Sequence, residues 1–446
     1  MNMTNRSAIR AVFAVFSMLL VLAALPARAE VKIQDVVSSS GVRAWLVEDY
    51  SVPIVSIRFA FKGGSTQNPA DRQGLANLMT GLFDEGAGDL DSDAFQIKLD
   101  DAGAEMSFSS SPDAIFGAMR MLADSQDAAF DLLRLAVTSP RFDQAPIDRI
   151  RSQILAGIRA GANDPAEKSR VAWRQALYPG HPYSLPEEGT AETLASITRD
   201  DLAGFHKRQF ARDNLTVGVV GAIDAETLKR RLDQVFGALP QKAELTTIAR
   251  TDVKFGQEIR VDYALPQTSI QLAWPGIERD DKDYFAAYLM NHILGGGTFS
   301  SRLFSEVREK RGLAYGVDSF LYNRDYDAGL MVSTATRADR AAETLSIIRA
   351  EVKRMADEGP TEAELEFAKK YVIGAYAIAN LDSSSAIART LVQLQMDDLG
   401  MDYIQRRVEL INSVTLDQVK DAAKRLLSAE PVVMLVGPPE ARGAIQ

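Results

Sequence analysis

The chain has 446 residues and not one cysteine. Disulfide bonds, thiolate metal ligands and a lipid anchor on cysteine are therefore excluded. Histidine is almost as scarce, because only His181, His206 and His292 are present and they lie far apart in unrelated segments. Protein zinc sites usually combine several close nitrogen, sulfur or carboxylate ligands. We therefore expect no metal ion bound by this chain.

Long apolar runs are absent after the first thirty residues. Before that point, Arg6 and Arg10 precede an apolar run over residues 11–25, and residues 27–29 form a small-x-small cleavage signature. This pattern predicts a secretory signal peptide over residues 1–29. The alternative is a membrane anchor, although the run is short of the ~20 residues that a span needs. We expect a periplasmic or secreted protein with no membrane span once the signal is removed.

An excess of positive charge is also missing. The net charge is −10 and no basic stripe is present, which argues against nucleic-acid binding. What remains is ordinary globular composition, with 46% hydrophobic and 25% charged residues. The length exceeds that of one typical core, so more than one domain is expected.

The rest of the chain repeats one order of elements. Alternating, β-branched runs predict strands at 54–61 and 268–274, each followed by an apolar helix, at 74–83 and 284–294. Repetition at long range of this kind is typical of a duplicated unit.

Later segments match in the same way. Long helices are predicted from Asp143 to near residue 160 and from Thr361 to near residue 379, with Asp143 and Thr361 as N-caps. Buried strands at 215–220 and 432–436 end the two halves.

The polar segment 240–254 lacks periodicity and predicts a linker. We therefore predict an α+β fold of two homologous domains, residues 30–239 and 255–446. Each would be a mixed, largely antiparallel sheet covered by helices.

Residues 74–83 read Gly-Leu-Ala-Asn-Leu-Met-Thr-Gly-Leu-Phe. This run resembles the zinc helix of the pitrilysin/insulinase peptidase family, where Gly-Leu-Ala leads into H-x-x-E-H. In that motif two histidines on one helix face hold zinc, the glutamate polarises a zinc-bound water, and a downstream glutamate completes the ligand set.

By this resemblance the three helix positions are Asn77, Thr80 and Gly81, and the downstream position is Gly157. None of the four carries a zinc ligand or a general base. The resemblance, which extends over about residues 36–437, therefore implies a family member with a degenerate zinc site and no zinc of its own.

A second motif lies in the other half, where Gly295, Gly296 and Gly297 precede a short helix. No Gly-Lys-Ser/Thr follows at P-loop spacing, so the glycines predict a helix end and a sharp turn instead. A strand predicted at 313–320 would fold back against the helix and bring Tyr315 to Arg308. On spacing alone, both residues also suit structural roles, an arginine at a helix C-terminus and an ordinary strand tyrosine.

The family's second halves carry an arginine and a tyrosine seven residues apart, as Arg308 and Tyr315 are. The resemblance implies that these two side chains contact the substrate carbonyl and the developing oxyanion, with the three glycines at the bound substrate. A guanidinium and a phenol are both good donors to a charged oxygen.

The resemblance implies a zinc-free subunit of a two-chain periplasmic zinc metallopeptidase. A homologous partner with H-x-x-E-H would provide the zinc, and both chains would bind a peptide or unfolded protein. The chain alone would be inactive. Two alternatives stay open: a peptide-binding or assembly scaffold without a catalytic role, and a peptidase active by itself, against which the four empty positions argue.

Overall fold

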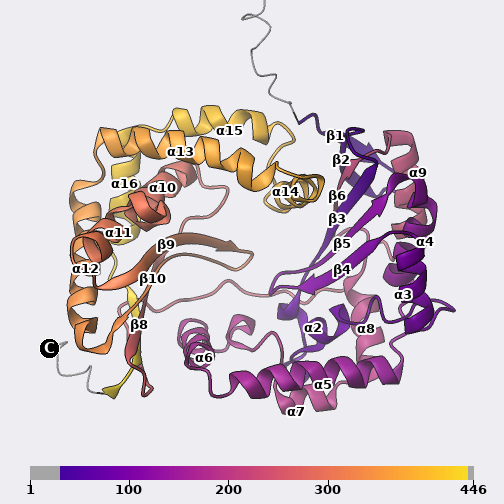
Figure 1. The fold of residues 1–446 in the computed structure, drawn as a ribbon, viewed down its shortest axis with the longest axis horizontal. Coiled ribbons are helices and arrows are strands. Elements are labelled where there is room, and N and C mark those ends of the chain that lie inside the picture. Colours follow the sequence, from indigo (N-terminus) through magenta and orange to yellow (C-terminus); the bar gives the residue numbers. More distant parts are fainter. Residues whose placement is uncertain (1–30, 440–446) are drawn as a thin grey trace, which may run out of the picture. The chain divides into compact units, whose positions relative to one another are not determined.

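The computed structural model describes residues 31–439, apart from the side chain of Thr298. The predicted signal peptide, residues 1–29, lies outside this range. Two sheets, one from each half of the chain, are each covered by helices (Figure 1). The predicted α+β fold class is confirmed, while the domain boundaries stay a prediction.

The first sheet has the strand order β1-β2-β6-β3-β5-β4. Its only parallel pair among the described residues is β2 with β6, so the sheet is mixed and largely antiparallel. The strands are β1 Gln34–Val37, β2 Arg43–Glu48, β3 Ile54–Lys62, β4 Glu105–Ser110, β5 Ala114–Leu122 and β6 Leu215–Gly221.

The second sheet has the order β7-β11-β8-β10-β9. Here too one pair is parallel within the described chain, β7 with β11, and its place corresponds to that of β2 with β6. Apart from β1, the topology of the first sheet therefore recurs in the second. The strands are β7 Glu258–Asp262, β8 Gln267–Pro275, β9 Ala314–Arg324, β10 Asp327–Arg337 and β11 Val432–Gly437.

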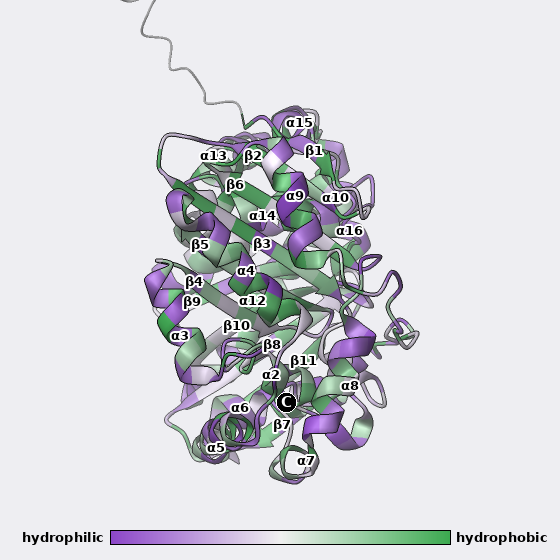
Figure 2. Cartoon of the chain, turned by 90° about the vertical axis from the view of Figure 1, so that its right-hand side faces the viewer, coloured by the Kyte–Doolittle hydropathy of each residue, from purple (hydrophilic) through white to green (hydrophobic). Residues whose placement is uncertain are grey.

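Alternation along β3 places Val55, Ile57, Phe59 and Phe61 in the first apolar core, against helices on one face of the sheet. Figure 2 shows the hydrophilic side of α9 facing outward over largely hydrophobic strands β3 and β6. The helices contributing to this core are α2 Leu75–Thr80, α3 Ser92–Asp101, α4 Gln126–Thr138, α5 Gln144–Gly161, α7 Ala191–Ser196, α8 Arg199–Gln209 and α9 Ala225–Phe236. The second core uses α10 Tyr284–Asn291, α11 Arg302–Phe304, α12 Ala341–Glu358, α13 Glu362–Asn380, α15 Tyr403–Asn412 and α16 Leu416–Leu427.

The remaining two helices are exchanged between the sheets (Figure 1). Helix α14 (Ser384–Met396), from the second half, lies on β3 and β6 of the first sheet. Helix α6 (Pro165–Leu177), from the first half, packs Trp173 and Leu177 against Met434 of β11. The free face of each sheet thus packs against a helix of the other half.

Most predicted elements are present, with two corrections. The helix predicted at 284–294 is α-helical only to Asn291 and continues as the π-helical turn His292–Gly296, because the glycines that follow do not sustain a helix. Thr361 is the N-cap of α13 and accepts a hydrogen bond from the Glu364 N–H. Asp143 makes no such bond, because its carboxylate accepts from Arg141 Nε at 2.6 Å instead.

The predicted linker segment 240–254 contains neither helix nor strand. Across residues 31–439, every helix is too short or too polar to cross a membrane.

Candidate functional site

The four degenerate zinc positions lie on two helices. Asn77 and Thr80 belong to α2, Gly81 is its C-cap and Gly157 belongs to α5. Asn77 and Gly157 line one cavity of about 720 Å³. Thr80 is buried, with its hydroxyl donating to the Asn77 carbonyl at 2.9 Å. At Gly81 an added Cβ would lie 3.0 Å from Ile150 Cγ2, so this position is packed.

One wall of this cavity is a face of α5 formed by Ile154, Gly157, Ile158 and Gly161, at helical i, i+3, i+4 and i+7 spacing. Outside the adjoining residues and backbone of α5 itself, no atom lies within 4 Å of where a Gly157 Cβ would be. The absence of a side chain at the downstream position therefore leaves open space, and the cavity has a largely aliphatic wall.

Arg174 of α6 lines the same cavity and is only 9% exposed. Its Nε has no hydrogen-bond partner in the described part of the chain, and burial lowers the pKa of its guanidinium. Nearby, Arg170 forms an ion pair with Glu188 at 3.3 Å. No sequence pattern pointed to Arg174, since α6 mixes charged and apolar residues like any surface helix.

The structure offers no metal site in residues 31–439, where no three His, Cys, Asp or Glu side chains are grouped to hold an ion. His181 Nε2 contacts the Ala249 carbonyl oxygen at 2.9 Å. His206 Nε2 contacts the Val137 carbonyl oxygen at 2.9 Å, and burial lowers the pKa of this histidine to about 4. His292 stacks on Tyr371 with ring centroids 4.9 Å apart. The side chains present do not fit zinc.

Arg308 and Tyr315 are brought together by a tight reversal of the chain. Arg308 lies in the π-helical turn Ser305–Glu309, which continues α11. Gly312 has a φ of +60°, and its N–H donates to the Arg308 carbonyl at 2.8 Å. The chain then enters β9, and the guanidinium carbon of Arg308 lies 4.5 Å from the centre of the Tyr315 ring.

A β-bulge sets the direction of Tyr315. Ala314 pairs with Thr336 and Val317 with Thr334, so the register shifts between these two pairs, at the start of β9. Bulges re-aim side chains in this way and are common beside functional sites. Tyr315 is 86% exposed.

Neither the Tyr315 hydroxyl nor the Arg308 guanidinium has a hydrogen-bond or ion-pair partner among residues 31–439. The two side chains hold each other through a cation–π contact, which uses the guanidinium face and leaves its N–H edges free. The pair can therefore donate hydrogen bonds to a group outside the chain. Whether that group is a peptide carbonyl stays a prediction.

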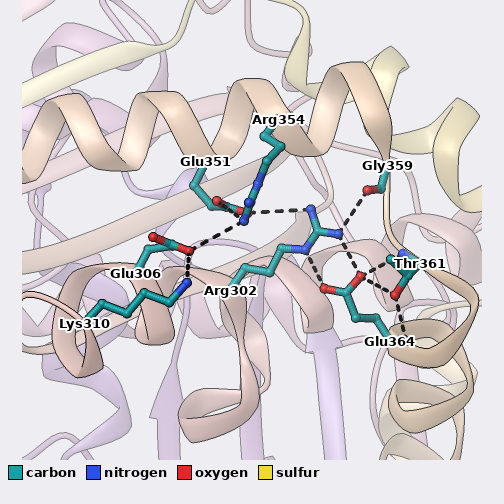
Figure 3. Close-up of polar contacts among 8 residues, drawn as sticks. All are labelled: Arg302, Glu306, Lys310, Glu351, Arg354, Gly359, Thr361 and Glu364. Carbon is teal, nitrogen blue, oxygen red and sulfur yellow. Dashed lines mark hydrogen bonds and ion pairs between the residues drawn. The ribbon is translucent and has the colours of Figure 1, made fainter.

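A network of ion pairs holds the helix that leads to Arg308 (Figure 3). Arg302 is 12% exposed and makes a two-pronged contact with Glu364 at 2.6 and 2.7 Å. It also donates to the Gly359 carbonyl at 3.1 Å and lies 3.6 Å from Glu351. These contacts fix α11 to the end of α12 and the start of α13.

Two carboxylates in this network are held ionised. Burial alone would raise the pKa of Glu364, but hydrogen bonds from Arg302 and Thr361 lower it to about 2. Hydrogen bonds from Lys310 and Arg311 lower the pKa of Glu306, in the same turn as Arg308. Ion pairs therefore hold this turn, while the N–H donors of Arg308 stay free.

The three predicted substrate-binding glycines serve packing. A Cβ at Gly295 would lie 2.6 Å from Ser319 Oγ of β9, and one at Gly297 would lie 2.8 Å from the His292 carbonyl oxygen. A Cβ at the exposed Gly296 would lie 2.8 Å from Asn291 Nδ2. These close contacts explain why the turn after α10 needs glycine at these positions. A role of the three glycines in binding substrate stays a prediction. The cavity at Asn77 and Gly157 is lined by neither Arg308 nor Tyr315.

Two family models match the chain. One is described as Insulinase (Peptidase family M16) and matches residues 43–190, and the other is described as Peptidase M16 inactive domain and matches residues 196–372. Together they match most of the first half and the second half as far as residue 372.

Solved structures and curated relatives agree with these matches. A crystal structure of a peptidase M16 inactive domain from Pseudomonas fluorescens is 30% identical, with a TM-score of 0.85 over 91% of this chain and 98% of that one. A non-peptidase homolog, YmxG, from Helicobacter pylori is 25% identical over 84% of this chain and 87% of its own. An uncharacterized zinc protease, also YmxG, from Bacillus subtilis is 24% identical over 90% and 97%.

Proposed function

The chain belongs to peptidase family M16, the insulinase family, and we propose that it is the zinc-free subunit of a two-chain zinc metallopeptidase. It is an inactive family member, because Asn77, Thr80, Gly81 and Gly157 stand at the ligand and base positions. The signal-like residues 1–29 support the further proposal that the complex is periplasmic or secreted.

The free Arg308–Tyr315 pair is the observation that carries this proposal. A cation and a phenol stand side by side, next to a bulge at the start of β9, and ion pairs of Arg302 hold the helix that leads to them. Donors fixed before the reaction stabilise a developing oxyanion without reorganisation. In the complex these two side chains donate to the substrate carbonyl, while a homologous subunit with H-x-x-E-H holds the zinc and the general base.

The surroundings suit an extended peptide. Strand β4 forms an edge of the first sheet, and exposed edges accept an added strand through main-chain hydrogen bonds. The cavity at Asn77 and Gly157 offers an aliphatic wall for an apolar side chain. These features support binding of a peptide or unfolded protein in either candidate function.

The second candidate is a peptide-binding or assembly scaffold with no part in catalysis. It is favoured by one relative, the Helicobacter pylori protein, whose name calls it a non-peptidase homolog. A scaffold gives no reason for a partnerless arginine and tyrosine held together at the surface, so we place it second.

Cleavage of a quenched fluorescent peptide tests the choice. The chain from residue 30 onward is assayed alone, with a zinc-bearing family member encoded beside it, and with both mixed. We expect only the mixture to reach full activity, and we expect Arg308→Ala and Tyr315→Phe each to lower kcat by about 10²–10³.

Arg349→Ala, which removes another exposed arginine, is the matched control and should leave kcat unchanged. If the mixture cleaves no faster than the zinc subunit alone, or if both site variants match this control, the scaffold function replaces the proposal.

A further inference from the structure

The face of the first sheet that α14 occupies is only partly covered. Gly218 of β6 lets α14 lie close, since an added Cβ would be 2.7 Å from the Ala388 carbonyl oxygen. Beyond α14, the strands β3, β5 and β4 leave a hollow of about 470 Å³. In register, Ala118 of β5 lies between Arg58 and Ser107, and its short side chain leaves room there.

Three arginines line this hollow, and they differ in their partners. Arg120 is paired with Glu105 at 3.0 Å. Arg58 of β3 and Arg389 of α14 have no hydrogen bond and no ion pair with any described residue. Arg58 stacks its guanidinium on Phe116, at 5.0 Å from the ring centre, so its N–H edges stay free.

The two unpaired arginines act on each other. Burial and the positive charge of Arg389 together lower the pKa of Arg58. Arg58 is half-buried and Arg389 is exposed, and two neighbouring cations without a counterion repel each other in the folded chain. The arrangement becomes favourable when an anion sits between them. Hydroxyls of Ser56 and Ser385, 3.4 Å apart, line the same hollow as further donors.

We propose that Arg58 and Arg389 bind a carboxylate of the peptide, and that this chain therefore selects acidic peptides. Guanidinium groups hold carboxylates through two parallel hydrogen bonds, which gives both strength and orientation. The chain is otherwise acidic, with a net charge of −10, and repels anions overall. The unpaired arginines make this hollow an exception that attracts anions. The inference rests on the proposed peptide binding and adds the class of substrate.

The carboxylate can come from an acidic side chain or from the C-terminus of the peptide. Four fluorescein-labelled decapeptides separate these sources: one central Glu or Gln in a neutral sequence, each with a free or an amidated C-terminus. Fluorescence anisotropy with the chain alone measures Kd, so no zinc subunit is needed.

We expect at least one carboxylate form to bind about tenfold more tightly than its neutral counterpart, and R58Q and R389Q each to remove that difference. R120Q is the matched control, because Arg120 lines the same hollow but already has Glu105, and it should keep the difference. If the Glu and free-acid peptides bind no better than the neutral ones, or if no peptide binds, the inference is wrong.

Thermal unfolding separates binding from folding. Since R389Q removes a like charge beside Arg58, its unfolding midpoint should equal or exceed that of the natural chain. A lower midpoint would show that Arg389 stabilises the fold and would overturn the assignment. A chain that selects acidic peptides but fails to stimulate a zinc subunit would refute the proposed catalytic role and leave the carboxylate site standing.

Discussion

Helices α5 and α13 hold equivalent places in the two halves, yet they are built differently. Only Ile147 of α5 is fully buried, its N-cap side chain makes no capping bond, and Gly157 faces an empty space. Helix α13 buries Leu365, Ala368 and Val372, among others, and begins with a capping box. The half that lost its zinc ligands is loosely held there, whereas the half with free donors is held firmly. Precise placement is concentrated in the half that carries the free donors.

The strongest test of this comparison between the two halves is to restore the family's zinc-site side chains at the four degenerate positions of the first half. We expect the combined variant N77H, T80E, G81H and G157E to change the chain from binding no zinc to binding one ion. Open space at Gly157 admits the glutamate, and only Ile150 must move for a histidine at position 81. Elemental analysis of dialysed protein measures the result.

The same variant with Gly157 retained is the control and should lose zinc on dialysis. A folded four-fold variant without zinc would show that α2 itself has shifted, so that more than side chains separates the two halves.

The second half should be sensitive at Arg302. We expect Arg302→Gln to lower the free energy of unfolding by about 3 kcal/mol, because it leaves the mostly buried Glu351 and Glu364 with fewer counter-charges. Urea unfolding at neutral pH measures the loss. Arg337→Gln, which breaks an exposed pair with Asp339, should unfold at the same urea concentration as the natural chain.

The dependence of stability on pH gives an independent check of this ion-pair network. The pKa of Glu364 is lowered from its ordinary value of 4.5 to about 2 in the folded chain, so its ionised form stabilises the fold above pH 4.5. That contribution fades as pH falls from 4.5 through 2. The stability difference between the natural chain and Glu364→Gln should therefore shrink over this range. A difference independent of pH would contradict the assignment.

The exchanged helix α14 approaches the first sheet closely at Gly218. An added Cβ at Gly218 would meet backbone of α14, so we expect Gly218→Ala to cost about 1–3 kcal/mol in the free energy of unfolding. Gly316 of β9 is the matched strand glycine, with nothing within 4 Å of an added Cβ. Equal unfolding midpoints for Gly218→Ala and Gly316→Ala would show that α14 shifts away without loss.

The smallest expected difference in the free energy of unfolding is between variants at the two helix N-caps. Thr361→Ala removes a capping box and should cost about 1 kcal/mol. Asp143→Ala loses no capping bond, so its effect on the urea midpoint should be clearly smaller. A larger loss at Asp143 would reverse the order of the two halves.

Local pattern was enough to predict the strands and most helices. Alternation placed β3 and β8 to within a residue or so at each end, because one face of each strand is buried. The spacing of Arg308 and Tyr315, with Gly312 between them, was enough to predict that the two side chains meet. The segment between Arg308 and Tyr315 is short, so the chain has few ways to connect the two residues.

Long-range arrangement was beyond sequence patterns. An apolar helix face shows that α14 packs on something, but does not show that it packs on the sheet of the other half. For the same reason, sequence patterns could not predict that Arg58 and Arg389 are neighbours. The two residues line one hollow only because α14 packs on the first sheet. The failed cap at Asp143 depended on a competing arginine two residues earlier.

Because α6 and α14 are exchanged, each half of the chain also protects the sheet of the other half while the protein folds. The first sheet is complete in sequence at Gly221, but the helix that covers it begins only at Ser384. A ribosome must therefore add more than a hundred and fifty residues before that face is shielded, and contacts of such long range form slowly. Conversely, a protease that cuts within residues 240–254 would break the chain and still leave two interlocked fragments.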